Sequence, residues 1–163
     1  RYLEEKFMTE KIESPVVGVL MGSSSDWEVM GNAVEMLKNF NVPYEAKVVS
    51  AHRMPDEMFK YAETARDRGI KVIIAGAGKA AALGGVVASH TPLPVIAVPM
   101  KTSDLGGMDS LLSTVQMPTG VPLACVAING TKNAAILATE ILGVSMPEYR
   151  DAIIEYKREL AGK

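Results

Sequence analysis

The chain has 163 residues, 48% of them hydrophobic, enough to bury the core of one domain of ordinary size. Lys and Arg total 17 and Asp and Glu total 19, so the net charge of -2 offers no basic surface to a nucleic-acid backbone or an acidic membrane. No apolar segment reaches the roughly 18 residues that span a bilayer, and the N-terminus lacks a secretion-type apolar core. We therefore expect a cytoplasmic protein that binds neither nucleic acid nor membrane.

The first 14 residues are polar and show no convincing periodicity. Met8, followed by Thr-Glu-Lys, is a candidate natural start, in which case residues 1–7 derive from an expression vector. The sequence thus divides into an N-terminal extension, residues 1–14, and a single domain, residues 15–163.

The domain opens with a short apolar run, Val16 to Met21, which is typical of a strand buried on both faces of a parallel sheet. The run stops at Gly22-Ser-Ser-Ser-Asp26, where small residues leave backbone N–H groups free at the start of a helix that continues to Phe40. We expect Asp26 to cap this helix. Such a corner is suited to binding an anion.

The strand-then-helix pattern repeats along the chain. Further strands are predicted at residues 44–50, 71–75, 95–98 and 123–128, and helices at about residues 54–68, 79–89, 108–115, 131–142 and 147–160. This alternation predicts an α/β fold, a flavodoxin-like three-layer sandwich with a parallel five-stranded sheet of order 2-1-3-4-5. The last helix is extra, and its apolar side (Tyr149, Ile153, Ile154 and Tyr156) has no later strand to cover, so we expect it to pack on a neighbouring subunit.

Three loops with polar or small residues lie at the carboxyl edge of the predicted sheet, where ligands bind in such folds: residues 22–26, 50–55 and 76–85. The second loop places His52, a group that exchanges protons near neutral pH, beside Arg53, whose fixed fork suits a carboxylate or phosphate. The alternative is a solvated pair without a role. Because this loop lies beside two other loops of small residues, a catalytic or binding role for His52 and Arg53 is favoured.

The first loop favours a mononucleotide. Ser23 and Ser25 at a helix start suit a phosphate, and Asp26 suits a ribose hydroxyl, although serine-rich turns commonly only cap helices. The loop lacks the lysine of an ATP-binding phosphate loop and the full glycine spacing of a dinucleotide site.

The remaining reactive side chains favour structural roles. Cys125 is the only cysteine, in an apolar run, and is interpreted as buried and structural. His90 ends a helix, and two histidines 38 residues apart without clustered carboxylates make a poor metal site, so none is expected. Asp104 and Asp109 are interpreted as solvent-facing or capping groups, with a role in a neighbour's site left open.

Six motifs in order resemble one family. GSSSDW, VVSAHRMPD, IIAGAG, TPLPVIAVP, GMDSLLSTVQMP and GVPLACVAING together resemble the class I N5-carboxyaminoimidazole ribonucleotide mutases of purine (IMP) biosynthesis, from about Val16 to Leu142. The resemblance implies a flavodoxin-like subunit, a homo-octamer with sites at subunit interfaces, and no metal or organic cofactor.

The resemblance also implies site roles. The family moves a carboxylate from exocyclic N5 to ring carbon C4 of an aminoimidazole ribonucleotide. By resemblance His52 is the general acid and base, Arg53 binds an anionic group, and the other substrate-binding positions are Ser23, Ser25, Asp26, Ser50, Ala51, Gly76, Ala77, Gly78, Lys79, Ala82 and Leu83.

One motif departs from the family. Where A-A-H-L-P-G is expected, this chain reads Ala80-Ala-Ala82-Leu-Gly-Gly85, with alanine in place of the histidine, and Lys79 stands where glycine is common. We expect weakened turnover with nucleotide binding retained. Two alternatives stay open: a class II carboxylase that uses CO2 directly, against which Arg53-Met-Pro55 and the GVP segment count, and a mononucleotide-binding homologue impaired by Ala82.

Overall fold

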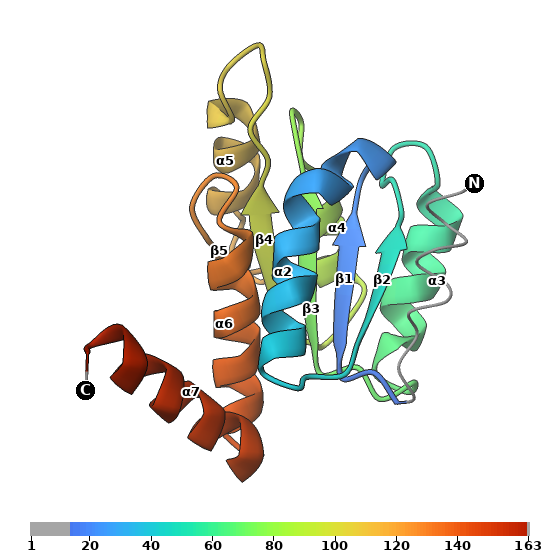
Figure 1. The fold of residues 1–163 in the computed structure, drawn as a ribbon. Helices are drawn as coiled ribbons and strands as arrows, with labels where there is room; N and C mark the ends of the chain where they lie inside the picture. Colours follow the sequence, from blue (N-terminus) through green and yellow to red (C-terminus); the bar gives the residue numbers. More distant parts are fainter. Residues whose placement is uncertain (1–13, 163) are drawn as a thin grey trace.

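The computed structural model describes residues 14–162, which form a five-stranded parallel sheet in the order β2-β1-β3-β4-β5 with helices on both faces (Figure 1). The predicted α/β class and strand order are confirmed. The elements are β1 (Val17–Met21), a 3-10 turn η1 (Ser24–Asp26), α2 (Trp27–Asn39), β2 (Tyr44–Val48), α3 (Pro55–Ala65), β3 (Val72–Ala77), α4 (Leu83–Ser89), β4 (Val95–Pro99), α5 (Met108–Val115), β5 (Ala124–Cys125), α6 (Thr131–Gly143) and α7 (Pro147–Leu160). The predicted N-terminal extension lies outside the described residues apart from Ser14.

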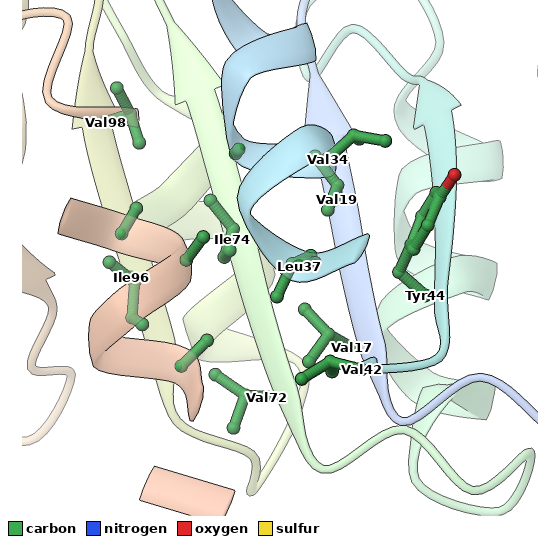
Figure 2. Close-up of a cluster of buried hydrophobic side chains, with 14 of the residues drawn as sticks. Val17, Val19, Val34, Leu37, Val42, Tyr44, Val72, Ile74, Ile96 and Val98 are labelled. Carbon is green, nitrogen blue, oxygen red and sulfur yellow. The ribbon is translucent and has the colours of Figure 1, made fainter. Parts of the chain in front are cut away.

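Alternate residues of the central strands face opposite layers. On one face, Val17, Val19 and Ile74 pack with the inner sides of α2 and α6, as Figure 2 shows around Leu37. On the other face, Leu20 and Ile73 join a second cluster with α3 and α4. Both faces of the sheet are therefore dry, which is why these strands read as continuous apolar runs.

Gly18 in β1 makes room for a tyrosine from α3. A Cβ atom at Gly18 would lie 2.2 Å from the Tyr61 hydroxyl oxygen. The guanidinium carbon of Arg68 lies 4.8 Å from the centre of the Tyr61 ring, and Arg68 donates a 2.7 Å hydrogen bond to Glu45. The packing of Tyr61 against Gly18 holds α3 close to the sheet. The loop that leads into α3 carries His52 and Arg53.

Several element boundaries shift from the sequence-based prediction, and two of the shifts affect the site and the edge of the sheet. The helix predicted from about residue 79 begins at Leu83, because Lys79 adopts a left-handed backbone (φ 55°) and residues 78–82 form a turn. The strand predicted over 123–128 shortens to Ala124–Cys125 at the edge of the sheet. Cys125 is accordingly half-buried rather than buried, with Thr114 Oγ1 3.3 Å from its sulfur.

The apolar side of α7 is largely covered by the same chain, so the interpretation that it awaits a neighbouring subunit is wrong for most of it. Tyr149 and Ile153 are buried in the core cluster with α6, and the Tyr156 ring meets Phe40 edge-on at 5.3 Å. Only Ile154 of the four predicted side chains is exposed. The helix extends from the end of α6, with its C-terminus away from the sheet (Figure 1).

Candidate active site

The three predicted loops meet at one pocket beyond the carboxyl ends of β1, β2 and β3. The cavity has a volume of about 500 Å³. It is lined by Gly22, Ser23, Ser25 and Asp26 after β1, by Ser50, Ala51, His52 and Arg53 after β2, by Ala77 to Leu83 at the end of β3 and after it, and by Thr102 after β4. Parallel strands bring their carboxyl ends to one edge of the sheet, so the chain folds these distant segments together.

The serine loop is held by its own hydrogen bonds. Ser23, in extended backbone, is the capping residue of η1: its hydroxyl oxygen accepts from the Ser25 backbone N–H at 3.3 Å, and the Asp26 carboxylate accepts from the Ser23 backbone N–H at 3.1 Å. Asp26 occupies the N-cap position of α2 as predicted, but its side chain makes no capping hydrogen bond to α2 and closes the reciprocal capping box of η1 instead. The hydroxyl oxygens of Ser23 and Ser25 lie 2.9 Å apart and both line the pocket.

Asp26 is a partly desolvated acid. Burial raises its pKa above the ordinary aspartate value, while the Ser23 backbone N–H and the Arg53 charge act in the opposite direction. A carboxylate that is costly to ionise gains from a hydroxyl donor or a cation brought by a ligand.

Arg53 ties two of the loops together. Its Nη2 donates to the Gly22 carbonyl oxygen at 3.0 Å, and its Nε donates to Ser50 Oγ at 3.2 Å. Ser50 Oγ also accepts from the Arg53 backbone N–H at 3.2 Å, which tightens the loop around the exposed His52 between them. The imidazole of His52 and the serine corner are therefore walls of the same cavity.

The third wall is the turn between β3 and α4. Lys79 lies in the left-handed region, which costs a residue with a Cβ atom about 1–3 kcal/mol. Glycine avoids this cost, which explains why glycine is expected at this position. Lys79 and Ala80 accept hydrogen bonds from Ala81 and Ala82, at 2.8 and 2.6 Å. Among the described residues, the backbone N–H groups of 78, 79 and 80 find no acceptor, and successive N–H groups around a left-handed residue form a concavity suited to an anion.

Four residues line the pocket in addition to the predicted ones, and one predicted residue lies away from it. Gly22, Ala80 and Ala81 belong to the predicted loops, whereas Thr102 lies outside them, and no motif singles it out beyond its place after β4. Gly76 lies inside β3 and not on the pocket wall: a Cβ atom there would be 2.4 Å from the sulfur of Met30, so this glycine serves core packing. Every other predicted site residue lines the cavity.

Groups outside the pocket have structural partners. His90 ends α4, where its ring lies 4.3 Å from Phe59 and its Nδ1 is 3.5 Å from a Glu63 oxygen. Within residues 14–162, His, Cys, Asp and Glu side chains form no group of three that could hold a metal ion. Over the same range, none of the helices combines the length and apolarity needed to cross a membrane.

Comparison with known proteins decides the family. The model of a family described as AIR carboxylase matches residues 16–163, almost the whole chain. The chain belongs to the AIR carboxylase family. Members similar to it include an Aquifex aeolicus protein, 62% identical over 135 residues (83% of this chain, 81% of the relative), and a Thermotoga maritima protein, 60% identical over 146 residues (90% and 85%). Both are named N5-carboxyaminoimidazole ribonucleotide mutase.

A solved structure in the comparison shares the family fold. The crystal structure of Treponema denticola PurE superposes with a TM-score of 0.83, covers 91% of this chain and 92% of its own, and is 31% identical. The AIR carboxylase family assignment therefore rests on agreement of sequence and fold over nearly all of the described chain.

Proposed function

We propose that the chain is an N5-carboxyaminoimidazole ribonucleotide mutase, which converts its substrate to 4-carboxy-5-aminoimidazole ribonucleotide in purine biosynthesis. One observation carries the proposal: the serine loop, His52 and Arg53 line a single cavity in a chain about 60% identical to proteins that bear this name. The substrate is an anionic mononucleotide, and the pocket offers what such a molecule requires.

Each loop has a part in binding. Ser23 and Ser25 would hold the phosphate, and Asp26 a ribose hydroxyl, which would also offset the cost of ionising its partly buried carboxylate. Arg53 would bind an anionic group with the N–H donors that Gly22 and Ser50 leave available. The free backbone N–H groups of the 78–82 turn are suited to the migrating carboxylate.

His52 would carry the proton. Cleavage of the N5–carboxylate bond leaves the electron pair on N5, which takes a proton from the imidazolium and releases CO2 into the cavity. Carbon C4 then attacks CO2 to form the new carbon–carbon bond, and its own proton returns to the imidazole. The histidine ends in its starting state, so no external acid, base or oxidant is consumed.

The mutase is tested by the choice of substrate. The expected result is turnover of N5-carboxyaminoimidazole ribonucleotide without added bicarbonate, with His52→Asn lowering kcat by about 10²–10⁴-fold while nucleotide affinity stays within a few-fold. Faster turnover of the uncarboxylated nucleotide plus bicarbonate would instead indicate direct carboxylation. Saturable binding without exchange of the C4 proton would indicate a binding protein impaired by Ala82. The half-buried His90, outside the pocket, supplies the matched control His90→Asn.

Assembly and location complete the proposal. Leu105, Met108, Leu112 and Val115 recur every three or four residues on and before α5, and each is more than half exposed, which supports the homo-octamer that the family resemblance implies. Sedimentation is expected to give a species of about eight chains, and a stable monomer would remove the octamer. A cytoplasmic location fits an enzyme of charged nucleotides, and cell fractionation tests it.

A further inference from the structure

An exposed ion pair joins two walls of the pocket. The Lys79 ammonium, on the turn after β3, donates to the Asp104 carboxylate on the loop after β4, with Nζ and Oδ2 2.7 Å apart. The hydrogen bond and charge of Asp104 raise the pKa of Lys79, and the same contact lowers the pKa of Asp104. Both groups are therefore charged over the physiological range.

The two loops also touch beneath the ion pair. A Cβ atom at Gly78 would lie 2.9 Å from the Thr102 methyl carbon, so the backbone of the turn rests directly against the β4–α5 loop. The Met100 backbone N–H donates to the Ala77 carbonyl oxygen at 2.9 Å. The β4–α5 loop is thus a support for the turn, and Lys79–Asp104 is its outermost fastening.

The turn needs a fastening because its shape is unfavourable for lysine. Lys79 is held at φ 55°, a conformation that glycine adopts freely and a lysine does not. The same conformation leaves three successive backbone N–H groups, at 78 to 80, without acceptors in the described chain. Relaxation of Lys79 toward ordinary backbone angles would disperse them.

We propose that the Lys79–Asp104 ion pair is a clasp that holds the 78–82 turn in its ligand-binding shape, which makes Lys79 a positioning residue of this site. Its ammonium acts through Asp104 on the backbone and does not bind the substrate. This inference rests on the proposed function, because it assigns the 78–82 turn to binding of the anionic substrate.

A set of substitutions separates a clasp from a direct contact. Because exposed ion pairs are weak, Lys79→Ala and Asp104→Asn are each expected to raise KM by about two- to five-fold with kcat within two-fold, and the double variant is expected to do no worse. Lys79→Gly loses the pair but not the backbone angles, so its KM stays nearer that of the original chain. The charge swap, Lys79→Asp with Asp104→Lys, restores most of the affinity. Lys157→Ala, which breaks the Glu140 pair between α6 and α7, is the matched control.

The opposite pattern overturns the clasp. If the ammonium binds substrate, Lys79→Gly and Lys79→Ala are equally impaired, Asp104→Asn is not, and the charge swap is worse than either. Hydrogen–deuterium exchange of the full chain gives a readout independent of activity: amides 81 and 82, whose hydrogen bonds to the carbonyl oxygens of 79 and 80 close the turn, are expected to exchange faster in Lys79→Ala and Asp104→Asn than in the Lys157→Ala control. Unchanged exchange refutes the clasp even if the mutase is active. Faster exchange in a chain that shows no turnover refutes the mutase and leaves the clasp standing.

Discussion

The Arg53 guanidinium donates a 3.0 Å hydrogen bond to the Gly22 carbonyl oxygen, and so joins the loop after β2 to the loop after β1. A second donor, Nε, is used by Ser50 Oγ, which leaves the remaining N–H groups of the fork for a ligand. Arg53 is therefore both a brace between two pocket walls and a candidate anion-binding group.

Arg53→Lys is expected to weaken substrate binding although the charge is kept. An ammonium is a point donor and cannot reach Gly22, Ser50 and an anion together. Loss of one charge-assisted hydrogen bond, about 1.5–3 kcal/mol, corresponds to a rise of at least about tenfold in KM or in the nucleotide Kd measured by calorimetry. Arg66→Lys, at an exposed arginine beside Asp67, is the matched control. A KM equal to that of the original chain would show that the fork geometry is not used.

Ala82→His is expected to raise turnover. Ala82 lines the pocket and is half-buried just before α4, so an imidazole there has access to the cavity. The family resemblance implies a histidine at this position, and a group that helps to orient the substrate or CO2 contributes to kcat more than to affinity. We expect kcat to rise by about tenfold or more with nucleotide affinity within a few-fold, measured by steady-state kinetics and calorimetry. Ala82→Asn, similar in size but without proton transfer, is the control, and equal kcat in all three proteins would show that the position is dispensable.

The regular elements followed from the sequence because both faces of the sheet are buried. Continuous apolar runs such as Val17–Met21 have no amphipathic ambiguity, and the proline and acids at the start of α3 mark its first turn plainly. The strand order then places residues 22–26, 50–55 and 77–83 at one edge, which is why nearly all of the predicted site residues share one cavity.

What could not be predicted depends on contacts between distant residues. Residues 79–82 are predicted from the sequence as the start of a helix, because the alanines have high helix propensity and no neighbouring residue indicates that Lys79 adopts a left-handed backbone. Gly76 reads as part of a glycine corner, but its absent side chain makes space for Met30 from α2. Thr102 carries no motif and reaches the pocket only because β4 lies beside β3.

Asp26→Asn is expected to leave the protein at least as stable at neutral pH. Because the fold raises the pKa of Asp26, its contribution to stability is complete below the unfolded value near 3.8 and is lost as the pH rises through the folded value. Asparagine stays neutral and its amide oxygen can still accept from the Ser23 N–H. Denaturant unfolding is expected to give the variant a higher free energy of unfolding than the original chain at about pH 7. Below about pH 4 the variant should have no such advantage. A lower free energy of unfolding for the variant at the higher pH would mean that the interactions of Asp26 with Arg53 and Ser23, and not its burial, have the larger effect on the pKa of Asp26.

Gly18→Ala is expected to destabilise the chain by about 1–3 kcal/mol, because the new methyl group would lie 2.2 Å from the Tyr61 hydroxyl oxygen in a packed interior. Tyr61→Phe in the same background removes that oxygen and is expected to recover part of the loss; the ring carbon at 3.2 Å keeps the recovery incomplete. Gly31→Ala is the control: its nearest neighbour, in Trp27, is 3.6 Å away, so alanine there should stabilise α2 by up to about 1 kcal/mol. Because α3 follows directly from the His52 loop, the Gly18 variant should also lower kcat. Free energies from denaturant unfolding that were equal for the Gly18 and Gly31 variants would show that Tyr61 moves aside without cost.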